Sequence, residues 1–531
     1  MGTPSTIPIA LYSDGTRSQG SFLPMPDELK YPTGYFAPTV MPLEVIRPAP
    51  PEAVIGFFSP DYYGYVGRET QIRITMQGGA YPYAFVIDSA PAGATISNDP
   101  TDKQNYSVLK FTPIENGTTT IQVRAYDQDG TQKTMRWTFT TSTDWCVFVE
   151  PTGVDSAGRG SFASPYKTLQ YARNNTTGGK ALILKNGTYT DTTLGITLNS
   201  ISVNSVLAWQ SRQAIIDLAA NVETSPSELF YINSSHMLAQ GLVVRNPQNA
   251  VANPRIFGGN SATNYVYQDD CLFEINGRLG TVNTDNVSCF FLGATNRSYI
   301  AQTRCEFDGF AGAANGWSAF DWYGVRYGKF ECNKLRNQVS SNTSAGLIWP
   351  KGTYNRDIDI HNNEFETEMS GSLIDIFMAN VGDPENATGN MDVAFNLIRC
   401  TGIGTAGIVI ARSSQWGTRL PVWTRRNTII NGVIYVMTFG TGYQYPVTLT
   451  SSSDVIQSTI ASTDPYKVIV INNNDAAGVY RPLSYRPNLT ASVTNFECHA
   501  NSGVVNSSGI LIGSYAQYRG RRGHEIRKTE V

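Results

Sequence analysis

The apolar positions of this chain recur in three-residue groups about thirty residues apart. In each group the third residue is apolar, and the first is small or carries an amide. The seven groups are Gly241-Leu-Val243, Cys271-Leu-Phe273, Cys305-Glu-Phe307, Asn333-Lys-Leu335, Asn363-Glu-Phe365, Asn396-Leu-Ile398 and Asn427-Thr-Ile429. Their first positions are spaced by 30, 34, 28, 30, 33 and 31 residues. A sustained period of this length is typical of stacked-repeat proteins, so the pattern predicts a β-solenoid over residues 144–500.

The pattern also predicts what each group position does in the solenoid. The third residue enters a shared interior column, while the second residue and the residue after the group face outward. An asparagine in the first position can hydrogen-bond its own backbone and stack into an amide ladder, and cysteine can replace it as a small buried group. We therefore expect Cys271 and Cys305 to be structural.

The N-terminal part of the chain has a different pattern. Residues 1–50 hold nine of the 27 prolines and no apolar periodicity, which predicts an extended arm. Residues 51–143 alternate apolar and polar side chains on both sides of Asp127-Gln-Asp-Gly130, which predicts a hairpin within a small β-sandwich. Asp127 and Asp129 are compatible with calcium ligation, but a hairpin turn explains them equally well and is the favoured interpretation.

Two segments carry family resemblances. The string YPYAFVIDSAPAGATI, with a strand ending in RAYDQDG, resembles Ig-like and cadherin-like modules of surface proteins. The segment Phe148–Ala172 and the following ALILKNGTYTD resemble the first coil of pectate-lyase-like proteins. The second resemblance implies an all-β protein with a right-handed parallel β-helix. A short amphipathic helix at Pro165–Arg173 would close the open first coil.

The pattern loosens toward the C-terminus. After Asn427 we expect an inserted hairpin at Tyr435–Thr450 and a further coil strand at Val468–Asn474. Residues 501–531 end in YAQYRGRRGHEIRKTEV, which predicts a basic, solvated tail that could also dock on an acidic partner.

Composition excludes several functional classes. Charged residues make up 16% and the net charge is −3, so nucleic acid is not expected as the main partner. The longest apolar runs are too short for a membrane-spanning helix, and the first residues lack the pattern of a secretion signal. Seven scattered cysteines without a CxxC pair favour buried thiols, and the four histidines lack metal-ligand spacing, so neither a metal nor a cofactor is expected.

The outward positions of the coils supply the candidate chemistry. Most charges there alternate in sign from coil to coil, which predicts columns of ion pairs. Glu274 and Asp308 break the alternation on adjacent coils, at a spacing close to that of the two carboxylates of retaining glycosidases. Like charges at this range raise the pKa of one carboxyl group, as an acid catalyst requires. Asp321 is a further candidate catalytic carboxylate.

An aromatic segment follows these carboxylates in the sequence. Trp317, Trp322, Tyr323 and Tyr327 lie within GWSAFDWYGVRYGKFE and are candidates for stacking on sugar rings. Packing of the same side chains against the solenoid is the alternative interpretation.

The motifs of known β-helix enzymes do not recur here. Polygalacturonases carry NTD, DD, GHG and RIK in that order, whereas Asp269-Asp270 precedes Asn283-Thr-Asp285 in this chain, which has no GHG or RIK. The RxPxxR string of pectate lyases is missing. The resemblance therefore implies the fold and not these activities.

The whole arrangement resembles bacteriophage tail spikes and spike-like head-decoration proteins. This resemblance implies a structural virion surface protein, assembled in the host cytoplasm, that decorates the particle and adheres to host-surface glycan. It also implies a homotrimer whose residues 1–50 contact other virion proteins. The alternatives are a polysaccharide depolymerase, either an endoglycosidase or a lyase, and a bacterial surface adhesin.

Overall fold

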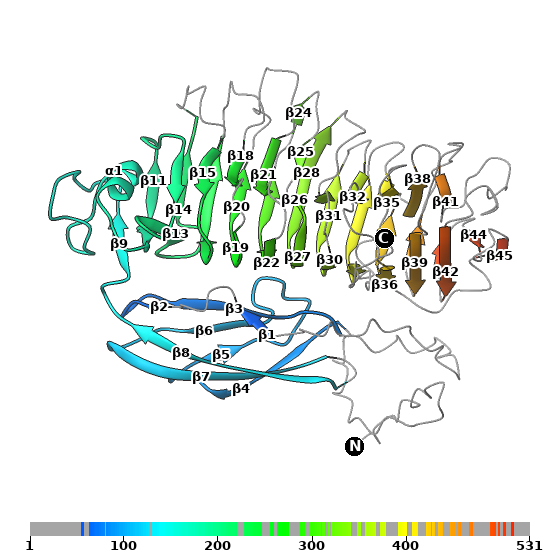
Figure 1. Cartoon of the computed structure of the whole chain (residues 1–531), viewed down its shortest axis with the longest axis horizontal. Helices are drawn as coiled ribbons and strands as arrows, with labels where there is room; N and C mark the ends of the chain where they lie inside the picture. The colour runs from blue at the N-terminus through cyan, green and yellow to red at the C-terminus, as the bar shows by residue number, and fades with distance from the viewer. Residues whose placement is uncertain are drawn as a thin grey trace.

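The computed structural model shows an all-β chain with two parts, a small pair of sheets lying alongside a long solenoid (Figure 1). It describes residues 55–57, 63–79, 81–127, 130–219, 228–246, 255–259, 263–274, 287–292, 297–308, 311–313, 317–318, 320–340, 348–351, 356–367, 372–378, 391–400, 406–412, 421–425, 427–430, 434–438, 447–452, 455–457, 467–470, 489–494, 497–499, 503–505 and 511–514. The predicted arm at residues 1–50 lies outside these ranges. Within the predicted tail, β44 (Gly503–Val505) and β45 (Leu511–Ser514) pair as a hairpin, and residues after 514 lie outside.

Three sheets run the length of the solenoid, and successive coils contribute strands to each of them. The strands pair in parallel except at the end of the third sheet, where Lys467–Val470 pairs antiparallel with the strand before it. The first sheet contains β9 (Cys146–Val149), β10 (Lys180–Leu184), β13 (Val203–Ala208), β16 (Met237–Gln240), β19 (Val266–Asp269), β22 (Arg297–Thr303), β27 (Val325–Glu331), β30 (Arg356–His361), β33 (Met391–Ala394), β36 (Pro421–Arg425), β39 (Val447–Ser452) and β42 (Leu489–Thr494). The second contains β11 (Gly187–Tyr189), β14 (Ala214–Asp217), β17 (Leu242–Arg245), β20 (Leu272–Glu274), β23 (Glu306–Asp308), β28 (Lys334–Ser340), β31 (Glu364–Thr367), β34 (Leu397–Cys400), β37 (Thr428–Ile430), β40 (Val455–Gln457) and β43 (Glu497–His499), with β24 (Ala311–Ala313) paired to β28. The third contains β12 (Ile196–Leu198), β15 (Glu228–Ile232), β18 (Arg255–Gly259), β21 (Val287–Leu292), β26 (Phe320–Tyr323), β29 (Ile348–Lys351), β32 (Ser372–Met378), β35 (Ala406–Arg412), β38 (Ile434–Thr438) and β41 (Lys467–Val470), with β25 (Trp317–Ser318) paired to β21.

The predicted interior column is confirmed by the strand register. Phe273 pairs with Phe307, Phe307 with Leu335, Leu335 with Phe365, and Phe365 with Ile398. All five side chains are buried in one core cluster, and the rings of Phe273 and Phe307 stack with centroids 5.0 Å apart. The parallel β-helix predicted from the thirty-residue period is therefore the observed fold.

Two details of the predicted repeat are corrected. Gly241 does not occupy the first group position, because Val244 rather than Val243 pairs with Phe273. Gly241 instead adopts a left-handed conformation (φ 71°) at the bend between the first and second sheets. The predicted hairpin at Tyr435–Thr450 is wrong, because β38 and β39 each pair in parallel with the preceding coil.

An amide ladder runs beside the interior column, as predicted. Asn333, Asn363, Asn396 and Asn427 are buried, and each side-chain NH₂ group of the first three donates to the Oδ1 of the next at 2.9–3.1 Å. Their backbone partners lie on neighbouring coils instead of on the same residue: Asn363 Nδ2 donates to the Phe330 carbonyl at 3.0 Å. Each amide therefore ties several coils together.

Cys146, Cys271, Cys289, Cys305 and Cys332 are buried and free, as expected for structural thiols. Cys271 and Cys305 precede the asparagines in the ladder column, and the Cys305 backbone N–H donates to Asn333 Oδ1 at 2.8 Å. Burial raises the pKa of the Cys305 thiol, with Cys271 beside it acting in the same direction. A neutral, unreactive thiol follows from this environment.

A short helix closes the first coil, as the resemblance implied. It is α1 (Leu169–Asn174), which begins later than predicted. Thr168 caps it by accepting a hydrogen bond from the Tyr171 N–H, and Asp155 in turn accepts from the Thr168 hydroxyl at 2.7 Å. Leu169 and Ala172 point from the helix into the solenoid core. No helix in the part of the chain that the structure describes is long and apolar enough to cross a membrane.

The N-terminal part forms two four-stranded sheets packed face to face. One has the order β1 (Ile55–Phe57), β3 (Thr70–Met76), β6 (Val108–Phe111), β5 (Thr95–Ile96), and the other β2 (Tyr63–Gly64), β8 (Gln132–Thr141), β7 (Gly117–Tyr126), β4 (Ala84–Ser89). Alternating residues such as Ile72, Ile121 and Phe139 fill the core between them. Asp127 lies in the β7–β8 turn and accepts from the Thr131 N–H at 2.7 Å. We call this unit the sandwich; its Ig-like classification stays a prediction.

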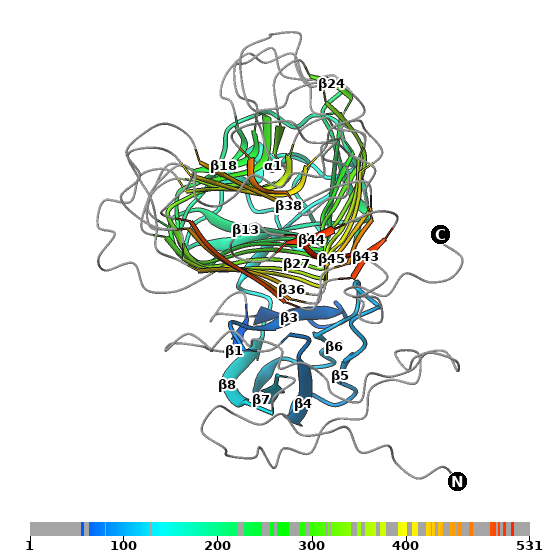
Figure 2. The same ribbon diagram turned by 90° about the vertical axis from the view of Figure 1, so that its right-hand side faces the viewer.

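The sandwich lies against the first sheet of the solenoid. Viewed along the solenoid, the three sheets enclose the core and β3 sits directly beneath the first sheet (Figure 2). Viewed from the side, the long sandwich strands run along the solenoid axis, across the direction of the coil strands (Figure 1). The outer face of the first sheet is therefore covered, and the outer faces of the second and third sheets are not covered by the sandwich.

Candidate functional site

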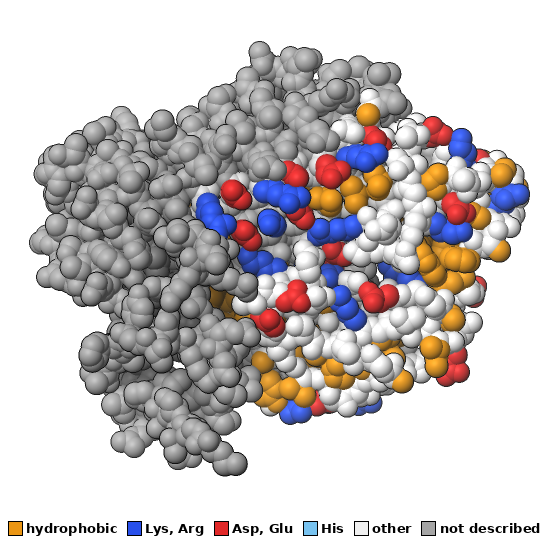
Figure 3. Space-filling model, turned by 180° about the vertical axis from the view of Figure 1, so that it is seen from behind, with side chains coloured by type: hydrophobic (Ala, Val, Ile, Leu, Met, Phe, Trp, Pro, Cys, Tyr) orange, Lys and Arg blue, Asp and Glu red, His pale blue; other side chains and the backbone are white. Residues whose placement is uncertain are grey.

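The second sheet carries the predicted columns of charge on its outer face. Glu274 of β20 pairs in register with Asp308 of β23, so the structure places these two candidate residues on adjacent coils. Both side chains are partly exposed. Acidic and basic side chains alternate in rows over the solenoid face seen from behind (Figure 3). The stacking that suggested a carboxylate pair is thus present.

Asp308 and two nearby carboxylates, those of Glu306 and Asp270, contact arginine side chains. Arg336 Nε contacts Asp308 Oδ2 at 3.0 Å, and the same guanidinium contacts Glu306 at 2.7 Å. Arg212 contacts Glu306 at 3.0 Å and Asp270 at 3.1 Å. Ion pairs between partly exposed side chains contribute only about 0.2–1 kcal/mol each, so the contacts of Arg336 stabilise the stack modestly.

Glu274 has a different environment. Its register neighbour on the preceding coil, Arg245, contacts Asp217 at 2.8 Å. Among the described residues, no ion pair joins the Glu274 carboxylate to a cation. Along the column, Glu274 therefore lies between Arg245, whose guanidinium contacts Asp217, and the carboxylate residue Asp308.

The remaining candidates lie on other faces of the solenoid. Asp321 belongs to β26 of the third sheet, where its backbone pairs with Phe291, so it does not share a face with Glu274. Trp317 of β25, and Trp322 and Tyr323 of β26, also belong to the third sheet. The predicted residues are therefore not brought together in one site.

Tyr327 lies on the first sheet and is buried. Its ring stacks on Tyr299 at 5.0 Å, Tyr299 stacks on Tyr265 at 4.7 Å, and Tyr265 stacks on His236 at 4.7 Å. The four residues occupy equivalent left-handed bend positions on successive coils, with φ between 56° and 61°. These rings stack on one another along the solenoid, which matches the alternative of packing against it.

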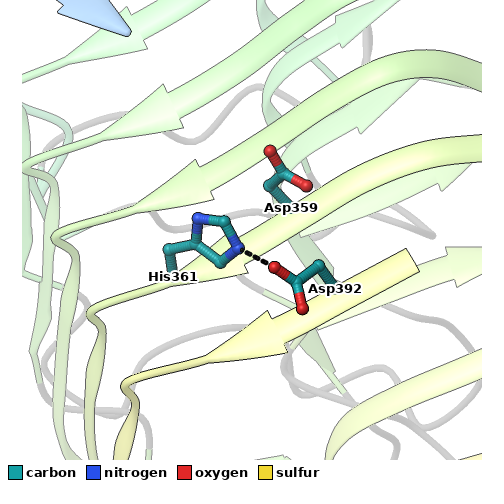
Figure 4. Close-up of side chains that lie close together, drawn as sticks. All are labelled: Asp359, His361 and Asp392. Atoms are coloured by element: carbon teal, nitrogen blue, oxygen red, sulfur yellow. Dashed lines mark hydrogen bonds and ion pairs between the residues drawn. The ribbon is translucent and has the colours of Figure 1, made fainter. Parts of the chain in front are cut away.

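A buried polar cluster that the sequence analysis missed lies on the covered first sheet. Asp359, His361 and Asp392 each present a possible ligand atom within 4.8 Å of the others, the one group of this kind in the described ranges. His361 Nε2 lies 2.8 Å from Asp392 Oδ2 (Figure 4). The ammonium group of Lys329 lies 3.4 Å from Asp359 Oδ2 and supplies positive charge beside the cluster. Because all four side chains are buried, we assign this cluster to the interface with the sandwich.

The sandwich contributes its own buried charge to this interface. Arg73 of β3 contacts Glu331 at 2.8 Å, and both side chains are essentially inaccessible to solvent. Burial opposes ionisation of Glu331, but Lys329 and Arg73 outweigh it and lower the pKa of that carboxyl below its ordinary value. In the same way burial opposes ionisation of Asp269, while Arg304 beside it lowers the pKa of Asp269.

The depressed pKa values predict an acid-sensitive interface. A carboxyl group whose pKa is lower in the folded state stabilises the fold above its ordinary pKa, and this stabilisation is lost as pH falls through the folded value. We expect the melting temperature to change little between neutral pH and about 4.5, the ordinary pKa of glutamate, and to fall steeply below it. Thermal unfolding followed across this range checks the prediction. The double variant D269N/E331Q is expected to melt at lower temperature at neutral pH and with a shallower acid slope; an unchanged slope would assign the acid sensitivity to other groups.

A sequence signal for this interface was available. Lys329, Asp359 and Asp392 align in register on successive strands of the first sheet, as do Glu331 and His361. Charged residues repeating at the coil period on strands that also supply core residues indicate a polar face with a partner. These charges lie outside the three-residue groups of the second sheet, so the thirty-residue pattern alone does not indicate the interface.

Comparisons with known proteins identify solved structures of similar fold but no protein family. No protein-family model matches the chain. No curated protein sequence matches it. The solved structures it resembles include a rhamnogalacturonan lyase (13% identity, TM-score 0.40, covering 66% of this chain and 87% of the lyase). A family 28 exopolygalacturonase of Yersinia enterocolitica (11% identity, TM-score 0.33) matches over 85% of this chain and 92% of the enzyme. PfbA, a surface adhesin of Streptococcus pneumoniae (11% identity, TM-score 0.25), matches over 56% of this chain and 88% of the adhesin.

These likenesses carry no argument about activity at such identities and TM-scores. They name two polysaccharide-degrading enzymes and one adhesin. The class supported by the strand pairing is a parallel β-helix protein with an N-terminal sandwich docked along it.

Proposed function

We propose that this chain is a structural surface protein whose solenoid adheres to polysaccharide. The observation that supports a structural role is the neutralisation of charge on the second sheet. Arg336 bridges Glu306 and Asp308, and Arg212 binds Glu306 in addition, so these carboxylates serve to hold neighbouring coils together. A long, regular face of stacked strands with paired charges suits repeated contacts with an extended polymer better than a single reaction centre.

The adhesion part of the proposal rests on the uncovered second and third sheets. The sandwich occupies the outer face of the first sheet, which leaves the strands carrying Glu274, Trp317 and Trp322 on the other two faces. Aromatic rings and ionised groups are the side chains that bind sugar rings and hydroxyl groups. We expect W317A and W322A each to weaken binding to a capsular or O-antigen polysaccharide, measured by isothermal titration calorimetry or a glycan array. The matched control is Tyr171→Ala on the capping helix, which is expected to leave binding unchanged; retained binding in both tryptophan variants would contradict the proposed faces.

The finer proposal is that this surface belongs to a bacteriophage particle. In it, residues 1–50 attach to other virion proteins, the chain forms a homotrimer, and the protein decorates the head or forms a tail spike. The support is the order of the predicted arm, the sandwich and the solenoid. Light scattering of the purified chain, together with electrophoresis in SDS without heating, tests the trimer: a mass of three chains supports it, and a monomer at micromolar concentration contradicts it.

The second candidate is a polysaccharide depolymerase. It is favoured by the placement of Glu274 beside Asp308 on adjacent coils, about 4.8 Å apart along the stack, because retaining glycosidases place their two carboxyl groups about 5–5.5 Å apart. In this hypothesis Glu274, which lacks an ion pair among the described residues, is the proton donor, and Asp308, which contacts Arg336, is the nucleophile.

The depolymerase hypothesis predicts a specific loss of product. E274Q and D308N are each expected to lower the release of reducing ends from the bound polysaccharide by about a hundredfold or more, because each removes one of the two groups that the reaction requires. Glu366→Gln, an exposed carboxylate of the same sheet, is the matched control and should retain full release. If the unmodified chain binds the polysaccharide and releases no reducing or unsaturated ends, the adhesive function stands and the enzyme hypothesis is rejected.

A further inference from the structure

Strand β3 of the sandwich crosses the coils of the first sheet. It runs along the solenoid axis, so its successive residues meet successive coils (Figures 1 and 2). The contacts of β3 and of the residues that flank it are, in chain order, Arg68 with the Ala208 carbonyl on β13, the Gln71 carbonyl with Gln240 on β16, the Gln71 side chain with Arg304 after β22, Arg73 with Glu331 on β27, and Gln77 with the Asp357 carbonyl on β30. These are hydrogen bonds of 2.8–3.0 Å between residues 140 to 280 positions apart in the chain.

Further contacts strengthen the same alignment. Lys329 Nζ donates to the Met76 carbonyl at 2.6 Å, and Asn362 Nδ2 donates to the Pro100 carbonyl at 2.6 Å. Lys103 of the sandwich contacts Glu364 at 3.5 Å. The sandwich thus reaches from β13 to β31, and its polar contacts follow the order of the coils.

Apolar packing joins the two parts over the same length. Side chains of the sandwich core and outward-facing side chains of the first sheet form one continuous buried cluster. The solenoid members of this cluster include Phe148, Ile183, Leu207, Leu238, Tyr267 and Ala301. The interface therefore combines a hydrophobic part near the capped end with a charged part farther along.

The charged part makes the contact costly to open. Arg73, Glu331 and Lys329 lose nearly all contact with water, and each would face solvent or an unpaired neighbour if the sandwich moved away. Removing one partner of a buried ion pair leaves an uncompensated charge, which is strongly destabilising. The sandwich is therefore held in one position and register.

From these contacts we infer that the sandwich is a longitudinal brace of the solenoid. Coils of a solenoid normally contact only their nearest neighbours, so coils can separate or fray one at a time. Through β3 and its flanking residues, the sandwich makes hydrogen bonds to the coils of β13, β16, β22, β27 and β30. Tyr267 of the intervening strand β19 belongs to the buried cluster that the two parts share. Coils β13 to β30 and the sandwich then unfold as a single unit, and the sandwich does not move as a hinge.

Cleavage of the connection between the two parts tests the brace directly. A specific protease site is inserted at Thr143-Asp144, two exposed residues between β8 and β9, in the full chain. After cleavage at neutral pH and physiological salt, the two fragments are expected to co-elute in size-exclusion chromatography and to melt in one transition. Separation of the fragments, or melting of the sandwich in a distinct transition that leaves the solenoid folded, would overturn the inference.

A set of variants tests whether coupling reaches distant coils. In the uncut chain, R73M removes the guanidinium that forms the buried ion pair with Glu331 and is expected to accelerate amide exchange by on the order of a hundredfold. The acceleration should appear both in β27, where Arg73 binds, and in β13 and β16, which Arg73 does not touch. Exchange measured by mass spectrometry that rises only around β27 would contradict a brace and indicate a local contact.

Two controls complete the set. The double variant R73M/E331M removes both charges and is expected to restore slow exchange, since apolar side chains of similar volume can replace a buried ion pair. Arg124→Met removes an exposed ion pair with Asp88 on the sheet of the sandwich that does not face the solenoid, and should leave exchange in β13 to β30 unchanged. A double variant as labile as R73M would show that β3 needs this charge pair to keep its position at all, and would overturn the claim that the whole strand acts as the brace.

Discussion

Replacing Phe307 by alanine is expected to lower the free energy of unfolding by about 3–5 kcal/mol, the range for deleting a large aromatic side chain from a packed core. Phe307 has no solvent-exposed surface, and its ring stacks on Phe273 one coil away. A cavity at this position removes contacts on both neighbouring coils, because Leu335 lies directly on the other side. Denaturant unfolding followed by circular dichroism measures the change.

Two further variants make this result specific. Phe307→Leu should cost much less, since leucine already fills the same column at Leu335. Leu272→Ala, at a partly exposed outward position one coil away, should cost about 1 kcal/mol or less. Equal losses for Phe307→Ala and Leu272→Ala would contradict the assignment of inward and outward positions.

Replacing Asn363 by alanine is expected to destabilise the chain by about 3 kcal/mol or more, since several buried hydrogen-bonding groups each lose a partner worth about 1–3 kcal/mol. The Asn363 amide accepts from the Asn333 backbone and side chain, and it donates to Asn396 Oδ1 and to the Phe330 carbonyl. Asn363→Asp should cost more, because it removes both donors and introduces a buried charge.

The ladder makes the effect of Asn363 extend beyond one coil. Thermal unfolding of Asn363→Ala should be compared with that of Glu366→Ala. Glu366 is an exposed residue of β31, the strand that follows Asn363, and its replacement is expected to shift the melting temperature little. If the two substitutions have the same effect, the amide ladder does not stabilise the stack.

The register of the second sheet could be predicted from the sequence because it is set by local repetition. Phe273, Phe307, Leu335, Phe365 and Ile398 lie at a regular period, and a buried column requires an apolar residue on every coil. The capping helix was predictable for a related reason, since an open first coil needs an apolar plug with a helix cap such as Thr168. The single offset at Gly241 arose because glycine suits both a small ladder position and a left-handed bend.

The thirty-residue repeat does not predict which residues of the second and third sheets lie near one another. The chain passes from the second sheet to the third through corner segments of variable length, so the sheet that receives Asp321 is not fixed by the period. Glu274 and Asp308 could be placed together because they share a sheet and a group position. Asp321 and the tryptophans belong to the third sheet, and their position relative to Glu274 and Asp308 therefore depends on the variable segments between the two sheets.

The sequence pattern also did not predict that the sandwich contacts the solenoid. The alternation of Ile72, Ile74 and Met76 indicates one buried face of β3, and the opposite face with Arg73 would ordinarily meet solvent. In the structure one face is buried in the sandwich, and on the other face Arg73 is buried against the solenoid, between the partly exposed Gln71 and Thr75. Only the complementary charges on the first sheet, such as Glu331, would have indicated a partner for that face.

Distances between spin labels on the second sheet test the stacked-coil arrangement most directly. Ile215, Val243, Leu272, Glu306, Lys334 and Glu364 follow one another in register on six successive strands. With labels introduced in pairs and measured by pulsed electron paramagnetic resonance, the 272–364 pair should be about 14 Å apart and the 215–364 pair about 24 Å apart, rising by about 4.8 Å per coil. Distances that do not increase with the number of intervening coils would contradict the stack, and with it the charged columns, the amide ladder and the brace.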